Sequence, residues 1–141
     1  MILLEPRNSL DIVIDNLEVD FDAPDGGLLP ALGPLSLTIA AHSFVCVLGP
    51  SGCGKTTLAR CLAGLQKPSS GSMFYGQHLI TEPIPEAKIM FQDSNLMPWR
   101  TVLDNVALPL ELAGVAKSVR HEKVRDILPS LGLSDFEGAY P

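Results

Sequence analysis

Gly49-Pro50-Ser51-Gly52-Cys53-Gly54-Lys55-Thr56-Thr57 is the stretch of sequence that decides the fold of this chain. It follows the apolar run Phe44–Leu48, which predicts a buried strand, and it precedes residues 58–63, which predict a helix. The closely spaced glycines allow successive N–H groups to face one centre, and the helix directs the positive end of its dipole there. This context predicts a loop that binds a nucleoside triphosphate, and it disfavours the alternative of an ordinary surface turn.

The residue types in this loop predict separate roles. Lys55 reaches the β- and γ-phosphates as a mobile cation, and the hydroxyl of Thr56 is placed to bind Mg²⁺. The other loop residues are expected to surround the phosphates, mostly through main-chain N–H groups. The predicted nucleotide-binding residues of the loop are Gly49, Pro50, Ser51, Gly52, Cys53, Gly54, Lys55, Thr56 and Thr57.

Composition limits the classes of partner. The chain has 141 residues, which fits one domain with a real core. Its formal net charge is −6, so it offers no broad basic surface and nucleic acid is not an expected partner. Residues 1–6 carry no basic segment typical of a secretory signal, and no apolar run approaches the ~18 residues of a membrane span. If the protein works at a membrane, another subunit is expected to hold it there.

The three cysteines are Cys46, Cys53 and Cys61, an odd number without a disulfide spacing pattern, which indicates a reducing cytosol. Cys53 lies inside the glycine loop, close to Lys55 in sequence, and we expect its thiol to be reactive there. Cys46 and Cys61 fall on predicted buried faces of the strand and the helix, so we expect them to react slowly.

Periodicity predicts strands on both sides of the loop. Apolar and polar residues alternate over 10–21, with a register break at Asn16, and again over 35–39 after a turn at 24–27. A short strand is predicted at 73–75. The run 87–91 predicts a further buried strand, whose end would place Gln92 beside the phosphates.

Helical patterns occupy the last third of the chain. Thr101 and Asp104 resemble a capping box at the start of one helix, and Pro109 is expected to kink or end that helix. A second helix is predicted from about 118 to 131, with Gly132 as its C-cap. Its predicted inward residues are Val124, Ile127, Leu128 and Leu131.

The phosphate loop alone fits kinases, GTPases, helicases and transport ATPases. A GTPase also needs a guanine-reading Asn-Lys-x-Asp, which this sequence lacks. The remaining classes are separated by two segments, Leu62-Ala63-Gly64-Leu65-Gln66-Lys67-Pro68-Ser69-Ser70-Gly71 and Phe91-Gln92-Asp93-Ser94-Asn95-Leu96-Met97-Pro98-Trp99-Arg100-Thr101-Val102-Leu103-Asp104-Asn105-Val106. With them, the chain closely resembles the ATP-binding subunits of ABC transporters over nearly all of residues 10–141. Within that superfamily, the sequence of residues 96–112 looks like the corresponding segment in the importers of nitrate, aliphatic sulfonates, taurine and pyrimidine precursors.

The resemblance implies an α/β fold, namely the RecA-like P-loop NTPase core of an ABC ATPase with N-terminal antiparallel strands and part of the helical subdomain. It makes residues 1–141 a single, incomplete nucleotide-binding domain. Residues 1–92 would hold the strands and the P-loop core as far as the glutamine loop. Residues 93–141 would form the partial helical subdomain.

The resemblance also implies roles for residues outside the loop. Phe21 matches the aromatic residue that stacks on adenine, a position more often tyrosine in the family, although a core position in its strand is the alternative. Gln92 matches the catalytic glutamine that contacts Mg²⁺ or the attacking water. The segment Leu96–Arg100 resembles the surface that receives a helix of the transmembrane subunit, with Trp99 as an anchor. Packing within the domain is the alternative for Trp99. The three histidines match nothing in the family and are expected at surface or loop positions.

In such a system the cofactors are ATP and Mg²⁺. The implied partners are the transmembrane permease subunits, a second ATP-binding subunit in a homodimer and, indirectly, a solute-binding protein. The implied location is peripheral, at the cytoplasmic face of the cell membrane.

The resemblance breaks off at Ala139-Tyr140-Pro141, just before the position of the family's Leu-Ser-Gly-Gly signature. The signature, the Mg²⁺-binding aspartate of the next apolar strand, the catalytic glutamate and the switch histidine would all follow. Two interpretations stay open. The chain is part of an ATP-hydrolysing subunit that drives solute import, or it is a nucleotide-binding or membrane-subunit-docking module without hydrolysis of its own.

We predict that the 141-residue chain shows no Mg²⁺-dependent ATPase activity above a buffer control. Phosphoryl transfer to water needs a group that positions the water and full neutralisation of the transition-state charge, and these residues supply only part of both. Phosphate release from the purified chain measures this directly. Activity that survives purification and disappears in Lys55→Ala would contradict the prediction.

Overall fold

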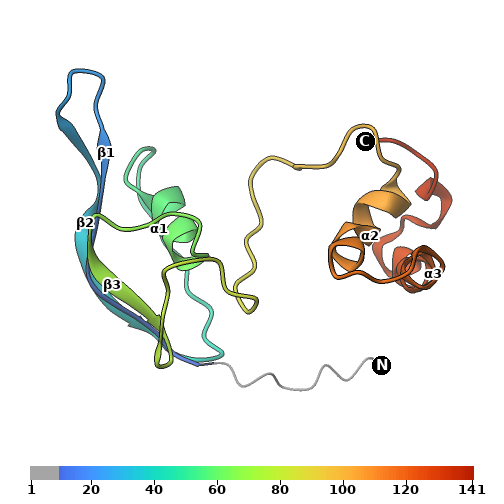
Figure 1. Ribbon diagram of the computed structural model, residues 1–141, viewed down its shortest axis with the longest axis horizontal. Coiled ribbons are helices and arrows are strands. Elements are labelled where there is room, and N and C mark those ends of the chain that lie inside the picture. Colours follow the sequence, from blue (N-terminus) through green and yellow to red (C-terminus); the bar gives the residue numbers. More distant parts are fainter. Residues whose placement is uncertain (1–9) are drawn as a thin grey trace. The chain divides into compact units, whose positions relative to one another are not determined.

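The computed structural model describes residues 10–141, so the prediction made for residues 1–6 lies outside the described part. The described chain forms two compact units, one that ends at Met90 and one that spans Phe91–Pro141 (Figure 1). Each unit has its own hydrophobic core.

The first unit is built on an antiparallel sheet. Its strands are β1 (Ile12–Asp22), β2 (Leu28–Ile39), β3 (Ser70–Tyr75) and β4 (His78–Leu79), in the spatial order β2-β1-β3-β4. Strand β1 is central, because it pairs with both β2 and β3, and Ile14 lies opposite Leu37 on one side and Met73 on the other. These strands confirm those predicted from the alternating pattern and the antiparallel N-terminal sheet that the family resemblance implies.

A bulge at Asn16 divides β1 into two phases. Asn16 has a φ of 45°, and the ladders to both neighbours shift register across it. Ile14 is buried before the bulge, and Leu17 and Val19 are buried after it. Without the extra residue, one of the two sets would face solvent, since side chains alternate along a strand. The register break predicted at Asn16 is confirmed.

Helix α1 (Lys55–Leu62) packs on one face of the sheet (Figure 1). Leu58 and Cys61 of the helix join a buried cluster with strand residues and Ile80, and burial raises the pKa of the Cys61 thiol. Gly64 follows the helix with a φ of 71°, as expected for a glycine that ends a helix. The strand residues of the cluster are Ile14, Leu17, Val19 and Met73.

Two predicted strands are absent from the described residues. Neither 44–48 nor 87–91 joins a sheet. Phe44 is 96% exposed, Leu48 is 87% exposed and Met90 is 97% exposed. A strand needs a neighbour that satisfies its N–H and C=O groups, and no part of residues 10–141 provides one for these two runs. The same difference leaves Cys46 exposed, contrary to its predicted buried position.

The second unit packs two helices, α2 (Val102–Leu112) and α3 (Lys117–Ile127), followed by 3₁₀ turns at Leu128–Leu131 and Ser134–Phe136. Thr101 is the N-cap of α2, and its hydroxyl accepts the Asp104 N–H at 3.2 Å, which confirms the predicted capping interaction. The core of the unit consists of Leu103, Ala107, Val124 and Leu128.

The two prolines near the helices have different effects. Pro109 was expected to kink or end its helix; it lies within α2, which continues to Leu112, so the helix does not end there. Near the end of α3, Pro129 lacks the N–H that would bond the carbonyl of Arg125, and the chain tightens into a 3₁₀ turn. Val124 and Leu128 face the core, which leaves Ile127 at the surface, and the tightened turn leaves Leu131 exposed, although both Ile127 and Leu131 were predicted to face inward. Gly132, with a φ of 68°, caps this turn as predicted.

Among residues 10–141, no helix has both the length and the apolar character needed to cross a membrane.

We predict opposite outcomes for two apolar truncations in the first unit. Phe44→Ser should change the free energy of unfolding by less than about 0.5 kcal/mol, because Phe44 already faces solvent. It should also reduce self-association of the chain, since it removes exposed apolar surface. Leu17→Ala, at a position with 0% exposure, should cost about 2–5 kcal/mol. Urea unfolding and light scattering measure the two effects. A cost for Phe44→Ser equal to that of Leu17→Ala would show that 44–48 is buried in solution.

Candidate functional site

The glycine loop is closed over itself by Lys55, the first residue of α1. The Nζ of Lys55 donates to the carbonyl of Gly49 at 2.8 Å and to that of Pro50 at 2.6 Å. It also lies 3.4 Å from the Sγ of Cys53. The ammonium group therefore sits at the centre of the loop, with neutral groups as its partners.

Two glycines allow the loop to take this shape. Gly52 has a φ of 82° and Gly54 a φ of 91°, in the left-handed region that favours glycine. A Cβ on Gly54 would lie 2.5 Å from the carbonyl oxygen of Ala31 in β2, closer than such atoms approach. The loop is thereby fixed against β2 at a distance that only glycine permits.

The loop presents positive charge without a carboxylate to neutralise it. Lys55 takes part in none of the ion pairs among residues 10–141. No side chain caps the N-terminus of α1, and its first turn has no acidic residue. The first N–H groups of the helix lack intrahelical acceptors and point toward the loop. This arrangement can accept an anion.

The hydroxyl groups at the start of α1 complete the donor set. Thr56 is exposed beside the loop and Thr57 is half-buried. A hydroxyl oxygen next to a phosphate cradle suits Mg²⁺, which keeps most of its water and takes few protein ligands. The donor set thus fits a polyphosphate with its Mg²⁺ ion, and it lies within the nine loop residues singled out from the sequence.

Phe21 lies in the same unit as the loop, near the end of β1. A shallow groove is lined by residues 30–33 of β2 together with Gly52 and Cys53 of the loop. Phe21 pairs with Leu29, one step along the ladder from the pair formed by Asp20 and Pro30. Its ring is 39% exposed and is not a member of the core, so the alternative of a buried core residue does not describe it.

Gln92 belongs to the second unit and is exposed. Its expected place beside the phosphates therefore stays a prediction. Trp99 is in the same unit, at 71% exposure, so packing within the unit does not account for its ring.

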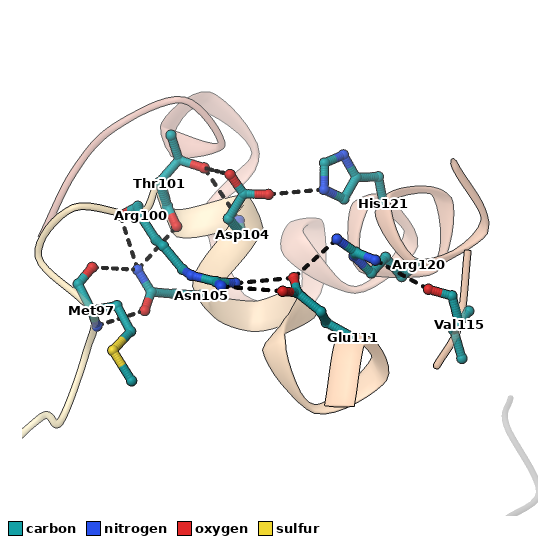
Figure 2. A network of polar contacts seen from close by, with 9 residues as sticks. All are labelled: Met97, Arg100, Thr101, Asp104, Asn105, Glu111, Val115, Arg120 and His121. Atoms are coloured by element: carbon teal, nitrogen blue, oxygen red, sulfur yellow. Dashed lines mark hydrogen bonds and ion pairs between the residues drawn. The ribbon is translucent and has the colours of Figure 1, made fainter. Parts of the chain in front are cut away.

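A network of polar contacts links the segment before α2 to both helices of the second unit (Figure 2). The amide of Asn105 bonds the preceding turn: its Oδ1 accepts the Met97 N–H at 2.8 Å, and its Nδ2 donates to the carbonyl of Met97 at 3.1 Å. The same Nδ2 donates to the carbonyls of Arg100 at 3.0 Å and Thr101 at 3.1 Å.

A chain of ion pairs continues the network. Arg100 donates both Nη groups to the carboxylate of Glu111 at 3.0 and 3.1 Å, and Arg120 of α3 donates to the same carboxylate at 2.9 Å. The hydrogen bonds from Arg100 lower the pKa of Glu111, and the bonded carboxylate raises that of Arg100. The other Nη of Arg120 donates to the Val115 carbonyl at 3.1 Å, so the network joins the turn to both helices.

Asp104 and His121 form a further contact between α2 and α3, at 3.0 Å. Burial alone would raise the pKa of Asp104, but hydrogen bonds from His121 and Thr101 outweigh burial and lower it. His121 was expected at a surface or loop position and instead lies half-buried on α3. Sequence reasoning also missed Asn105. The available signal was an asparagine in the first turns of a helix, where its propensity is poor.

The chain belongs to the ABC transporter family, whose model matches residues 32–141. This match identifies the class of protein to which the loop, the sheet and the helical unit belong. An uncharacterized ABC transporter ATP-binding protein of Methanocaldococcus jannaschii is 39% identical over 135 residues, covering 96% of this chain and 50% of that protein.

Two relatives are named for the solutes that they import. A taurine import ATP-binding protein of Rhizobium johnstonii is 38% identical over 128 residues, covering 91% of this chain and 49% of that protein. A nitrate import ATP-binding protein of Synechococcus elongatus is 36% identical over 135 residues, covering 94% of this chain and 20% of that protein. The predicted resemblance to the nitrate and taurine type of ATP-binding subunit is confirmed.

The fold matches solved ATP-binding cassettes. One is the dimeric post-hydrolysis state of a cassette bound to ADP and Pi, with a TM-score of 0.77 and 26% identity, covering 92% of this chain and 61% of that one. The predicted α/β ABC ATPase fold is confirmed. The chain spans about half the length of the first two relatives.

We predict that Mg·ATP slows alkylation of Cys53 and leaves Cys46 unaffected. Both thiols are exposed, but only Cys53 lies in the loop beside Lys55, where bound phosphates would cover it. Cys61, with 0% exposure, should react slowest and serves as the buried reference. Mass-spectrometric mapping of maleimide labelling measures the three rates. An unchanged Cys53 rate at saturating ATP would exclude this side chain from the nucleotide site.

Proposed function

We propose that this chain is part of the ATP-binding subunit of an ABC importer, which couples the binding and hydrolysis of ATP to the transport of a small solute. The observation that carries the proposal is the Lys55 ammonium, held at the centre of a glycine loop by neutral carbonyl groups. A cation without a carboxylate partner, at the N-terminus of a helix, favours a polyanion over other ligands.

The loop residues have distinct tasks in this proposal. Residues 49–57 surround the phosphates, and Lys55 contacts the β- and γ-phosphates, where it offsets the charge that develops in the transition state. Thr56 and Gln92 would hold Mg²⁺, which supplies further charge neutralisation when bound. Gln92 would also orient the attacking water. The exposed ring of Phe21 stacks on the adenine.

The relatives support the solute class and the partners. Taurine and nitrate are small anions or zwitterions, and we infer a solute of similar size and charge from the names of those two relatives. Permease subunits, with an indirectly acting solute-binding protein, would hold the chain at the cytoplasmic face of the membrane. A second copy would pair with it, as in the dimeric cassettes of the same fold. The segment Leu96–Arg100, with the exposed Trp99, is the proposed docking surface for the permease.

Titration with a fluorescent ATP analogue tests the nucleotide site. Lys55→Ala should weaken binding about ten- to hundred-fold, because a charge-assisted hydrogen bond to phosphate is lost while the loop amides remain. Lys88→Ala is the matched control: its Nζ also donates to a main-chain carbonyl, that of Pro85 at 2.6 Å, but it lies outside the loop. Equal affinities for the wild type and Lys55→Ala would refute the proposed nucleotide site.

A further inference from the structure

The turn that carries Trp99 has little regular structure of its own. Residues 97–100 belong to no helix or strand, and one main-chain hydrogen bond closes them, from the Arg100 N–H to the Met97 carbonyl at 3.0 Å. A turn with one such bond is expected to fluctuate in water. Something else must supply the partners that a helix or sheet would provide.

Asn105 supplies them from the first turns of α2. Its amide pairs with both the N–H and the C=O of Met97, in the way that a neighbouring strand would, and it also binds the carbonyls of Arg100 and Thr101. Asparagine is a poorer helix former than alanine. The helix therefore gains nothing from this residue by propensity, and three of the four hydrogen bonds of its side chain go to residues 97–100.

Arg100 fixes the other end of the turn. Its guanidinium forms a two-pronged pair with Glu111, which Arg120 of α3 also contacts. Bidentate pairs of this kind define orientation as well as distance. The ring of Trp99 therefore stands between two fastened residues, Met97 and Arg100, yet it is 71% exposed and belongs to no core cluster.

We propose that Asn105 is a positioning residue, which holds the 97–100 turn in one conformation so that Trp99 is presented as a pre-formed anchor. The proposal rests on the proposed docking of this segment to a permease subunit and adds how the anchor is prepared. A segment that is already ordered avoids the ordering cost on association, so fastening the turn strengthens docking without any contact by Asn105 itself.

Trp99 is the sole tryptophan of the chain, so its time-resolved fluorescence anisotropy reports on this turn alone. Self-association of the chain lengthens only the slow phase of the decay, whereas local motion of the ring sets the fast phase. For backbone sites, an order parameter S² of about 0.85 marks a rigid segment and a value below about 0.6 a flexible one. The fast amplitude scales with 1 − S², so if the ring follows the backbone of the turn, this amplitude should rise about two- to three-fold in Asn105→Ala.

Two further variants make the result specific. Asn105→Asp keeps an acceptor for the Met97 N–H but loses the Nδ2 donor, and it should also increase the fast amplitude. Val124→Ala destabilises the core of the same unit without touching the turn, and it should leave the amplitude unchanged. Circular dichroism of each variant reports whether the helices remain.

Three outcomes would overturn the proposal. The first is an equal fast amplitude in the wild type, Asn105→Ala and Asn105→Asp. The second is a flexible Trp99 already in the wild type. The third is loss of helicity in both Asn105 variants while Val124→Ala stays helical, which would make Asn105 a residue needed for folding of the unit.

Docking is tested separately, by co-purification of Trp99→Ala with the permease subunits. Unchanged co-purification would remove the proposed docking role of Trp99 and leave the anisotropy result standing. A rigid turn that ignores Asn105, together with lost co-purification of Trp99→Ala, would remove the positioning role and leave the docking surface.

Discussion

The packing of α1 against the antiparallel sheet is the constraint on which the phosphate loop depends. Leu58 and Cys61 anchor the helix in the buried cluster, so the first residue of the helix, Lys55, has a fixed place above β2. Gly54 then approaches the carbonyl of Ala31 as closely as a residue without a side chain allows. The loop is held by the helix that follows it and by the strand beneath it. Its shape is a property of the whole first unit.

The second unit is held in its conformation by a different kind of interaction. Its two short helices share a small apolar core, and much of the remaining definition comes from side chains that bind main-chain groups. Asn105 binds three carbonyls, and Arg120 joins a carboxylate to the carbonyl of Val115. Such contacts are local and partly exposed. They define the conformation of a surface segment without adding much buried area.

What could be predicted from the sequence follows from how each feature is encoded. The bulge at Asn16 was predictable, because the buried positions change parity there, from Ile14 to Leu17. The loop was predictable from the spacing of its glycines and Lys55. Burial of 44–48 was predicted from its apolar composition. Composition shows that a segment favours a buried position, but it does not show whether a neighbouring strand is present to pair with it. The contacts of Asn105 left little trace, since main-chain acceptors carry no sequence signal, and the position of Gln92 relative to the loop remains a prediction.

The hydrogen bonds of Lys55 to Gly49 and Pro50 also bear on the thermodynamics of ligand capture. The ammonium group occupies the middle of the loop, where it bonds two carbonyls of the loop itself. An arriving polyphosphate would exchange these neutral acceptors for anionic ones while the backbone keeps its course. Little conformational entropy is then lost on binding, and the gain from exchanging acceptors goes into affinity instead of into ordering the loop.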